Sequence, residues 1–154
     1  MENLSGTVAS VLAEYFDAAA ERIASLTEPL TEEQFWTNPF PYGNSVGHLL
    51  LHLTGNLNHN IGALIAGTGY VRDRDREFAE SERPSKQDLL QRFQETAAMV
   101  VSTIRNQSPA DWSAPFQAER SKARTRLGIL FACATHLRLH EGHMQYLSKE
   151  WAKG

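Results

Sequence analysis

The histidines carry the most distinctive chemistry in this sequence, because three of the six fall in one short segment, THLRLHEGHMQYL. His136, His140 and His143 follow one another at intervals of four and three residues, a spacing that puts all three on one face of a helix. His48 and His52 repeat the four-residue interval earlier in the chain. Six histidines placed at random in a chain of this length would give only about 0.2 pairs at this interval. The two observed pairs, His48/His52 and His136/His140, therefore indicate a functional arrangement.

Metal coordination is the chemistry that this spacing favours. Two imidazoles four residues apart on a helix lie about 6 Å apart, within reach of one cation about 2.0–2.1 Å from each nitrogen. A third ligand must then come from another helix. The alternative is that each histidine is half-buried and bonded to a carbonyl group or to water, which would explain any one of them but explains the set less well.

Two common metal motifs are excluded by their spacing. The segment HEGH, which begins at His140, is one residue shorter than the HExxH motif of zinc proteases. Ferritin-like di-iron bundles need a glutamate three residues before a histidine on two helices, and no glutamate in this chain precedes a histidine by three. A mononuclear site made only of histidines remains. Three neutral ligands would leave a divalent ion its full charge and at least one open coordination position, as in catalytic zinc sites.

Helices must position these side chains, and the apolar periodicity predicts four long ones. No segment shows the two-residue alternation of a strand. Residues Tyr70–Pro84 are polar and alternate in charge, so they are expected to form a long crossover loop. These elements predict an all-α fold, a four-helix bundle with one long crossover. The expected helical segments are about Thr7–Leu26, a capped turn from Thr31 to Trp36, Ser45 to about Ala66, Ser85 to about Asn106, and about Thr125–Ala152.

Both helices that carry several histidines are predicted to turn them toward the apolar face. In the second long helix, His48, His52, Asn56 and His59 share a face beside leucines. In the last helix, a similar set falls within an arc of about 100°. Its members are Ile129, Cys133, His136, His140, His143, Met144, Leu147 and Trp151. Two helices are thus expected to point imidazoles into the bundle.

Composition is that of an ordinary globular protein. The chain has 154 residues, of which 42% are hydrophobic and 21% charged, with a net charge of −3. One domain is expected at this length, and neither nucleic acid nor an anionic membrane surface is an expected partner. The polar, acidic N-terminus and the lack of an apolar run of about 20 residues predict neither an export signal nor a membrane span. One cysteine fits a reducing compartment, so a cytoplasmic location is expected.

The segments NSVGHLLLHLTGN and HLRLHEGHMQYL resemble the two signature helices of the DinB-like (DinB/YfiT) superfamily of metalloenzymes, and the likeness spans nearly the whole chain. This resemblance implies a single DinB-like four-helix bundle domain over residues 1–154. In that family a histidine late in an S-x-x-x-L-L-x-H-L stretch joins an H-x-x-x-H pair of the last helix to bind one divalent ion. The matching residues here are His52, His136 and His140. His48 falls one turn before the family's ligand and is therefore assigned to ligand support or packing.

The resemblance also implies a cofactor and a reaction. Zinc and nickel both suit imidazole ligands, and the sequence does not choose between them. Because the family includes thiol-dependent S-transferases, of the YfiT and maleylpyruvate isomerase kinds, transfer involving a low-molecular-weight thiol is the first expectation. A metal-dependent hydrolase and a non-catalytic, stress-associated metal-binding or interaction bundle are the alternatives. Many members continue the pair as H-R-G-Q where this chain has HEGH, so the family's substrate contact through Arg or Gln is in doubt. Asn56 and His143 are candidates for supporting the ligands.

Other residues leave two interpretations open. Cys133 could be a fourth ligand or a redox thiol, but a lone buried cysteine more often serves packing. The loop Arg72–Phe78 could hold an anionic substrate over the site, although a solvated loop with surface ion pairs is the preferred interpretation. The tryptophans could line a pocket, but they are more simply core or interface residues of an expected homodimer. They are Trp36, Trp112 and Trp151.

Overall fold

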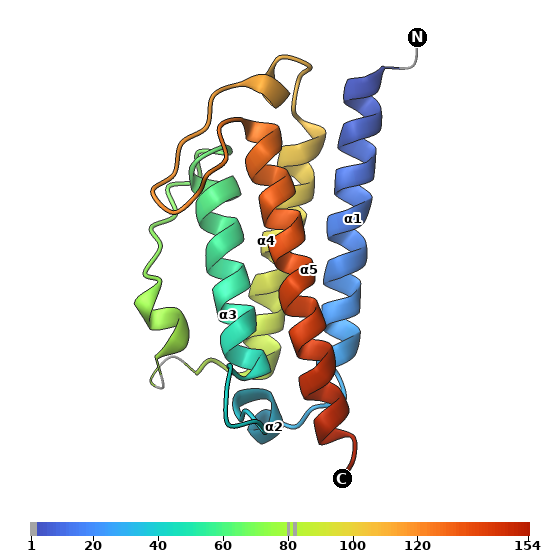
Figure 1. The fold of residues 1–154 in the computed structure, drawn as a ribbon, viewed down its shortest axis with the longest axis vertical. Helices are drawn as coiled ribbons and strands as arrows, with labels where there is room; N and C mark the ends of the chain where they lie inside the picture. Colours follow the sequence, from blue (N-terminus) through green and yellow to red (C-terminus); the bar gives the residue numbers. More distant parts are fainter. Residues whose placement is uncertain (1–2, 80, 82) are drawn as a thin grey trace.

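The protein is an all-α bundle in the computed structural model, which describes residues 3–79, 81 and 83–154 (Figure 1). The parts of the predicted domain and crossover loop that fall on residues 1, 2, 80 and 82 lie outside the described residues. The described residues form helices and no named strand, so the fold class predicted from the sequence is confirmed. The α-helices are α1 (Leu4–Thr27), α2 (Glu32–Trp36), α3 (Val46–Leu57), α4 (Lys86–Arg105) and α5 (Arg126–Trp151). Two 3₁₀ helices that were not predicted lie within the loops, η2 (Asp75–Phe78) and η3 (Asp111–Ser113).

Side-chain caps begin four of these helices at the residues that the sequence predicts. Thr31, Ser45, Ser85 and Thr125 each accept a hydrogen bond from the backbone N–H three residues later, at 3.1–3.2 Å. At Thr31 the capping box is complete, because its own N–H donates to Gln34 Oε1 at 3.0 Å. The caps therefore fix where α3 and α5, the helices that carry the histidines, enter the bundle.

The second long helix changes its geometry after Leu57. There α3 ends and the chain continues as a π-helix, η1 (Asn58–Ala63), whose turns hold one more residue than those of an α-helix. The helix predicted to run to about Ala66 therefore changes type after Leu57 and ends at Ala63. Gly67 and Gly69 follow with φ values of +68° and +77°, a conformation that favours glycine and ends the helical path.

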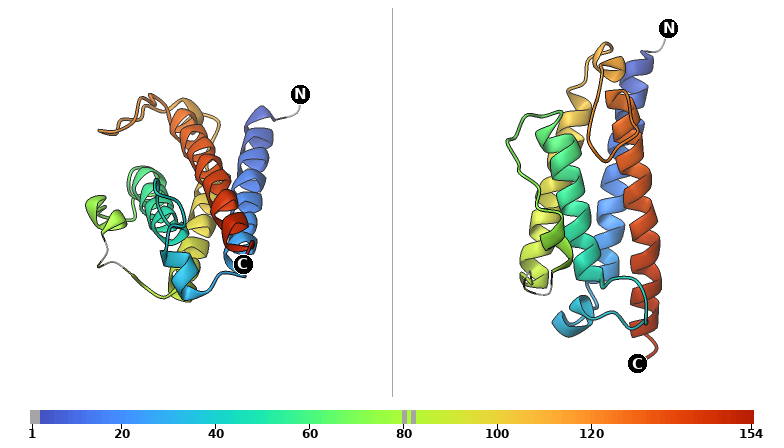
Figure 2. Two further views of the ribbon diagram at one scale, coloured as in Figure 1. Left: turned by 60° about the horizontal axis from the view of Figure 1, so that its bottom comes forward. Right: turned by 60° about the vertical axis from the view of Figure 1, so that its left-hand side comes forward.

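The direction of the helices explains why the crossover loop is long. In Figure 1, α1 runs downward, α3 and α4 run upward, and α5 runs downward again, an order that the views in Figure 2 also show. Because α3 and α4 are parallel, the chain between them must return along the length of the bundle. On this path η2 packs against α3. The crossover loop therefore passes beside the helix that carries His52.

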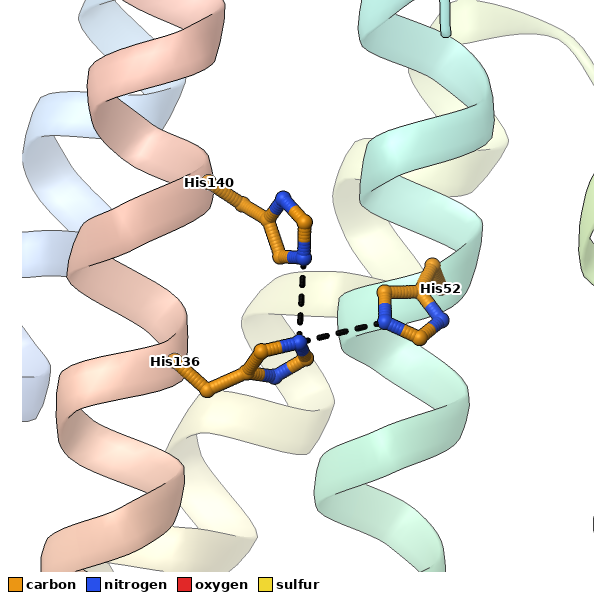
Figure 3. A group of neighbouring side chains, drawn as sticks. All are labelled: His52, His136 and His140. Atoms are coloured by element: carbon orange, nitrogen blue, oxygen red, sulfur yellow. Dashed lines mark hydrogen bonds between the residues drawn. The ribbon is translucent and has the colours of Figure 1, made fainter. Parts of the chain in front are cut away.

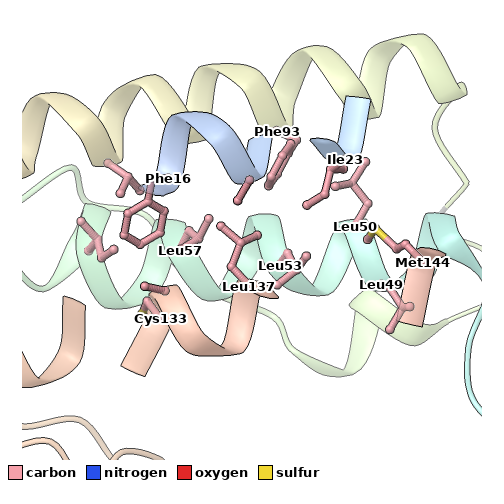
Figure 4. Close-up of a cluster of buried hydrophobic side chains, with 14 of the residues drawn as sticks. Phe16, Ile23, Leu49, Leu50, Leu53, Leu57, Phe93, Cys133, Leu137 and Met144 are labelled. Atoms are coloured by element: carbon pink, nitrogen blue, oxygen red, sulfur yellow. The ribbon is translucent and has the colours of Figure 1, made fainter. Parts of the chain in front are cut away.

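An apolar core fills the space between the helices (Figure 4). Every long helix contributes side chains that are at most 1% exposed, among them Phe16, Ile23, Leu50, Leu53, Phe93 and Leu137. The tryptophans belong to this core: Trp36 and Trp112 are buried in it, and Trp151 packs against it. Within the described residues, no helix combines the length and the apolar character that crossing a membrane requires.

The close packing of Trp36 on Gly47, a glycine within α3, gives a test of this core. A Cβ atom on Gly47 would lie 2.5 Å from Trp36 Cε3 and 2.6 Å from Cζ3, whereas nothing lies within 4 Å of a Cβ on Gly142. We expect Gly47→Ala to lower the free energy of unfolding by about 1–3 kcal/mol through overpacking. Gly142→Ala should be neutral or stabilising by up to about 1 kcal/mol, because alanine has the higher helix propensity. Urea unfolding with a chelator present measures both, and equal effects would contradict the packing of Trp36 on Gly47.

Candidate metal centre

Three imidazoles converge between α3 and α5 (Figure 3). His52 projects from α3, and His136 and His140 project from α5 one turn apart. Nε2 of His136 lies 3.2 Å from Nε2 of His52 and 3.0 Å from Nε2 of His140. One nitrogen from each ring lies within 4.8 Å of the other two. The fold thus brings together the three residues that the resemblance singled out, although 84 positions separate His52 from His136.

The spacing and charge of these rings fit a small divalent cation. Two nitrogens bound to zinc at tetrahedral angles lie about 3.3 Å apart, since each is about 2.0–2.1 Å from the ion. The observed spacings of 3.0 and 3.2 Å are close to this value. Burial, together with the charges of neighbouring histidines and arginines, lowers the pKa of His136 to about 4, and burial with neighbouring histidines lowers that of His140 to about 3. Both rings are therefore uncharged at neutral pH and have lone pairs to offer a metal.

A carboxylate from the crossover loop contacts the far side of His52, and sequence reasoning missed it. Glu77 Oε2 lies 2.9 Å from His52 Nδ1, while Arg72 donates to both oxygens of Glu77, from Nε at 2.6 Å and from Nη2 at 2.9 Å. Burial alone would raise the pKa of Glu77, but hydrogen bonds with His52 and Arg72 and the Arg72 charge lower it overall. Glu77 is therefore an ionised, buried partner of His52. No spacing rule points to it, because it follows His52 by 25 residues in a different element.

His136 and His140, the two histidines that α5 contributes to the group, differ in what supports them. Nδ1 of His140 lies 3.2 Å from Nδ1 of His143, which is exposed on the surface of the helix. One of these nitrogens must donate and the other accept, so the contact fixes the orientation of the His140 ring. Nδ1 of His136 is buried and has no hydrogen-bond partner within the described part of the chain. His143 thus contacts a member of the group, as the sequence analysis proposed for a supporting residue.

The other polar residues predicted to share a face of α3 with His52 lie in two different regions, one at the start of the helix and one beside a cavity. Nδ1 of His48 lies 2.7 Å from Ser45 Oγ, and its ring packs edge-on against Trp36 with centroids 5.3 Å apart. His48 therefore lies at the start of α3, among core residues and outside the group of three. Asn56 and His59 instead line a cavity beside His52.

This cavity has a volume of about 890 Å³ and opens beside the imidazoles. Its walls come from α3 and η1, the crossover loop at residues 71–75, the loop at residues 118–121, and α5, which contributes His136. Cys133 also lines it but is only 3% exposed, and burial raises the pKa of its thiol to about 12. The thiol is thus protonated at neutral pH, which favours the packing role over a redox role.

The crossover loop contains both solvated and buried ion pairs. Arg76 and Asp73 are 3.9 Å apart with side chains 69% and 62% exposed, as expected for a solvated loop. The Arg72–Glu77 pair, in contrast, has side chains only 11% and 7% exposed. The interpretation of the whole segment as a solvated loop is therefore wrong for Arg72 and Glu77, because Glu77 points inward from the 3₁₀ turn η2 and Arg72 pairs with it. The Phe78 ring also packs on His52, with centroids 5.1 Å apart.

A four-helix bundle with a long crossover and a histidine group between its second and last long helices defines a known class of helical proteins. The sequence profile of the DinB superfamily matches residues 15–144, and the chain belongs to this superfamily. The recognition made from the two signature helices is thereby confirmed.

Solved structures support the same fold. Six chains match, and one of them is a crystal structure described as the conserved protein of locus from Enterococcus faecalis. It superposes with a TM-score of 0.74 at 20% sequence identity, covering 91% of this chain and 94% of that one. At this identity the similarity concerns the fold alone. No curated protein matches the sequence significantly.

The buried imidazoles predict how stability depends on pH when no metal is present. His136 and His140 bind protons in the unfolded chain below about pH 6.5, but in the folded protein only near pH 4 and 3. The unfolded state therefore binds more protons in this window, and the free energy of unfolding should fall as the pH decreases from about 6.5 toward 4. Urea unfolding in a chelator should show this loss, and His140→Gln should make it shallower. Parallel curves for the two proteins would argue against burial of a neutral His140.

Proposed function

We propose that this protein binds one divalent metal ion, zinc or nickel, through Nε2 of His52, His136 and His140. The observation that carries the proposal is the convergence of three imidazoles, from two helices, at spacings close to those of zinc ligands. Three ring nitrogens that face one another cannot all accept hydrogen bonds from within the group. A shared cation would satisfy all three lone pairs at once.

The site is suited to catalysis rather than to structural support. An ion held by three neutral ligands retains its charge and can lower the pKa of a coordinated thiol or water molecule toward neutrality. The cavity of about 890 Å³ beside His52 and His136 is large enough for a small organic molecule. Asn56, His59 and Asn60 line it and can orient polar groups of a ligand. A purely structural metal site would need no such cavity.

Thiol transfer is the reaction that we favour, with metal-dependent hydrolysis as the second candidate. The support for it is membership in the DinB superfamily, together with the resemblance of the histidine positions to those of its thiol-dependent transferases. Glu77 does not suit the role of a general base, because Arg72 and His52 occupy both of its oxygens. A low-molecular-weight thiol would bring its own nucleophilic sulfur. The expected homodimer stays a prediction.

Metal content tests the proposed binding of one divalent ion. We expect about one zinc or nickel ion per chain by emission spectroscopy after incubation at neutral pH. His52→Gln should abolish tight binding, whereas His48→Gln should weaken it by at most about 10-fold, because the His48 ring contacts Ser45 and Trp36 instead. The two variants form a matched pair, one turn apart on α3. No metal in the wild-type protein, or equal loss in both variants, would overturn the assignment.

Reaction rates with thiols test the proposed thiol transfer. A free thiol with a pKa of about 8.5 is mostly protonated at pH 6, so conjugation to an aryl chloride, with release of chloride, should be fast there only with the metal-loaded protein. The rates to compare are those of glutathione, bacillithiol, mycothiol and cysteine with loaded protein, metal-free protein and His140→Ala. Identical rates with and without metal for all four thiols would reject thiol transfer. Ester and amide substrates under the same metal control then test hydrolysis.

A further inference from the structure

The crossover loop contacts His52 of the metal centre through the carboxylate of Glu77, with Arg72 and the Phe78 ring beside it. We propose that Glu77 is a positioning residue of this centre: it holds His52 with Nδ1 as a hydrogen-bond donor and Nε2 facing the ion, and it thereby couples the crossover loop to metal binding. The inference rests on the metal binding proposed above. It assigns a role to a residue that no histidine motif includes.

The hydrogen bonds around Glu77 determine the tautomer of His52. An ionised carboxylate can only accept, and Glu77 Oε2 lies 2.9 Å from His52 Nδ1, so Nδ1 must carry the proton. Arg72 Nη2 lies 3.4 Å from the same nitrogen, but a guanidinium only donates and is already bound to Glu77 at 2.6 and 2.9 Å. With its proton on Nδ1, the neutral ring presents a lone pair at Nε2. That atom is the one directed at His136.

Gly55 provides the space that lets the carboxylate reach His52. A Cβ atom on residue 55 would overlap Glu77 Oε1 and would lie 2.9 Å from Glu77 Cδ and 3.4 Å from Arg72 Nε. Gly55 lies inside α3, and its φ is not among the positive values that favour glycine. Close approach of the loop, rather than backbone conformation, is therefore what requires glycine here. Gly55 lies one turn after His52 on α3, at the point where Glu77 and Arg72 of the crossover loop approach this helix.

The rest of the crossover loop is less closely packed than Glu77. A cavity of about 450 Å³ lies between the loop and α3 and α4, lined by Tyr70 and Val71 among others. The cavity of about 890 Å³ lies on the other side and is lined by residues 71–75. Space on both sides leaves the Arg72–Glu77–His52 contact as a main attachment of this segment to the bundle. Disturbing that contact should therefore loosen the loop.

Metal binding and loop attachment must then depend on each other. An imidazole that donates its Nε2 lone pair to a cation becomes a stronger donor through Nδ1, so its hydrogen bond to Glu77 strengthens. Coupling between two equilibria is reciprocal. The factor by which attachment of the loop through Glu77 raises metal affinity equals the factor by which bound metal favours the attached loop.

Two variants remove the contact in different ways. Glu77→Gln keeps the size of the side chain but loses the charge, and Gly55→Ala keeps the carboxylate but fills its space. Each should weaken Zn²⁺ binding by about 10- to 100-fold in competition with a chelator, the range for residues that support a ligand. Asp73→Asn, the same loss of charge on an exposed side chain of the same loop, should change affinity less than about 2-fold.

Two further measurements separate positioning from general destabilisation. In the metal-free protein, nitrogen NMR should find His52 protonated on Nδ1, whereas Glu77→Gln should show a mixture of tautomers, because an amide can donate or accept. Added Zn²⁺ should slow hydrogen exchange of residues 70–79 in the wild-type protein and in Asp73→Asn, but not in Glu77→Gln or Gly55→Ala. Wild-type affinity, tautomer and exchange in both Glu77→Gln and Gly55→Ala would overturn the inference. Failure of the wild-type protein to bind Zn²⁺ would instead overturn the proposed function, and the metal-free tautomer would still test the contact.

Discussion

The contact between His52 on α3 and the His136–His140 pair on α5 is destabilised when the rings become charged. Three cationic imidazoles whose nitrogens lie within 4.8 Å would repel one another strongly, and burial removes the water that could screen them. The lowered pKa values of His136 and His140 are the measure of this constraint. The packing of α3 against α5 therefore includes a cluster of polar rings, in which His136 contacts both His52 and His140. A cation shared by the three rings, as proposed above, would satisfy their lone pairs and would link the stability of the bundle to its chemistry.

The topology of the bundle extends the same site into the crossover loop. Because α3 and α4 are parallel, the loop must run along α3, and this path carries Arg72 and Glu77 past His52. The direction of one helix thus determines which residues can support a ligand on another. A bundle with antiparallel α3 and α4 would need only a short turn there and could not supply this carboxylate. The length of the loop is a consequence of the fold. The loop brings the buried Arg72–Glu77 pair to His52, where the pair can support a metal ligand.

The sequence predicts the fold well because the signals for it are local. Apolar periodicity and the caps at Ser45 and Thr125 identify the helices, and the four-residue spacing of His136 and His140 puts both on one face. What could not be predicted depends on distant contacts or on small changes in hydrogen-bond register. The π-helix η1 follows α3 without a breaking residue at its start. Glu77 is one of several acidic residues in the charged loop, and it differs from its exposed neighbours Asp75 and Arg76 in the same 3₁₀ turn only by pointing inward to His52.

The charges around the proposed centre favour an anionic nucleophile. Glu77 and Arg72 form a buried pair whose charges cancel, so Glu77 can orient His52 without neutralising an ion bound at Nε2. Three histidines add no charge of their own. A divalent ion would therefore keep a charge close to two toward the cavity that His52 and His136 line. A direct carboxylate ligand would have reduced this charge, whereas one placed behind a histidine does not. Such an ion would stabilise a bound thiolate, which is the property that the proposed thiol transfer requires.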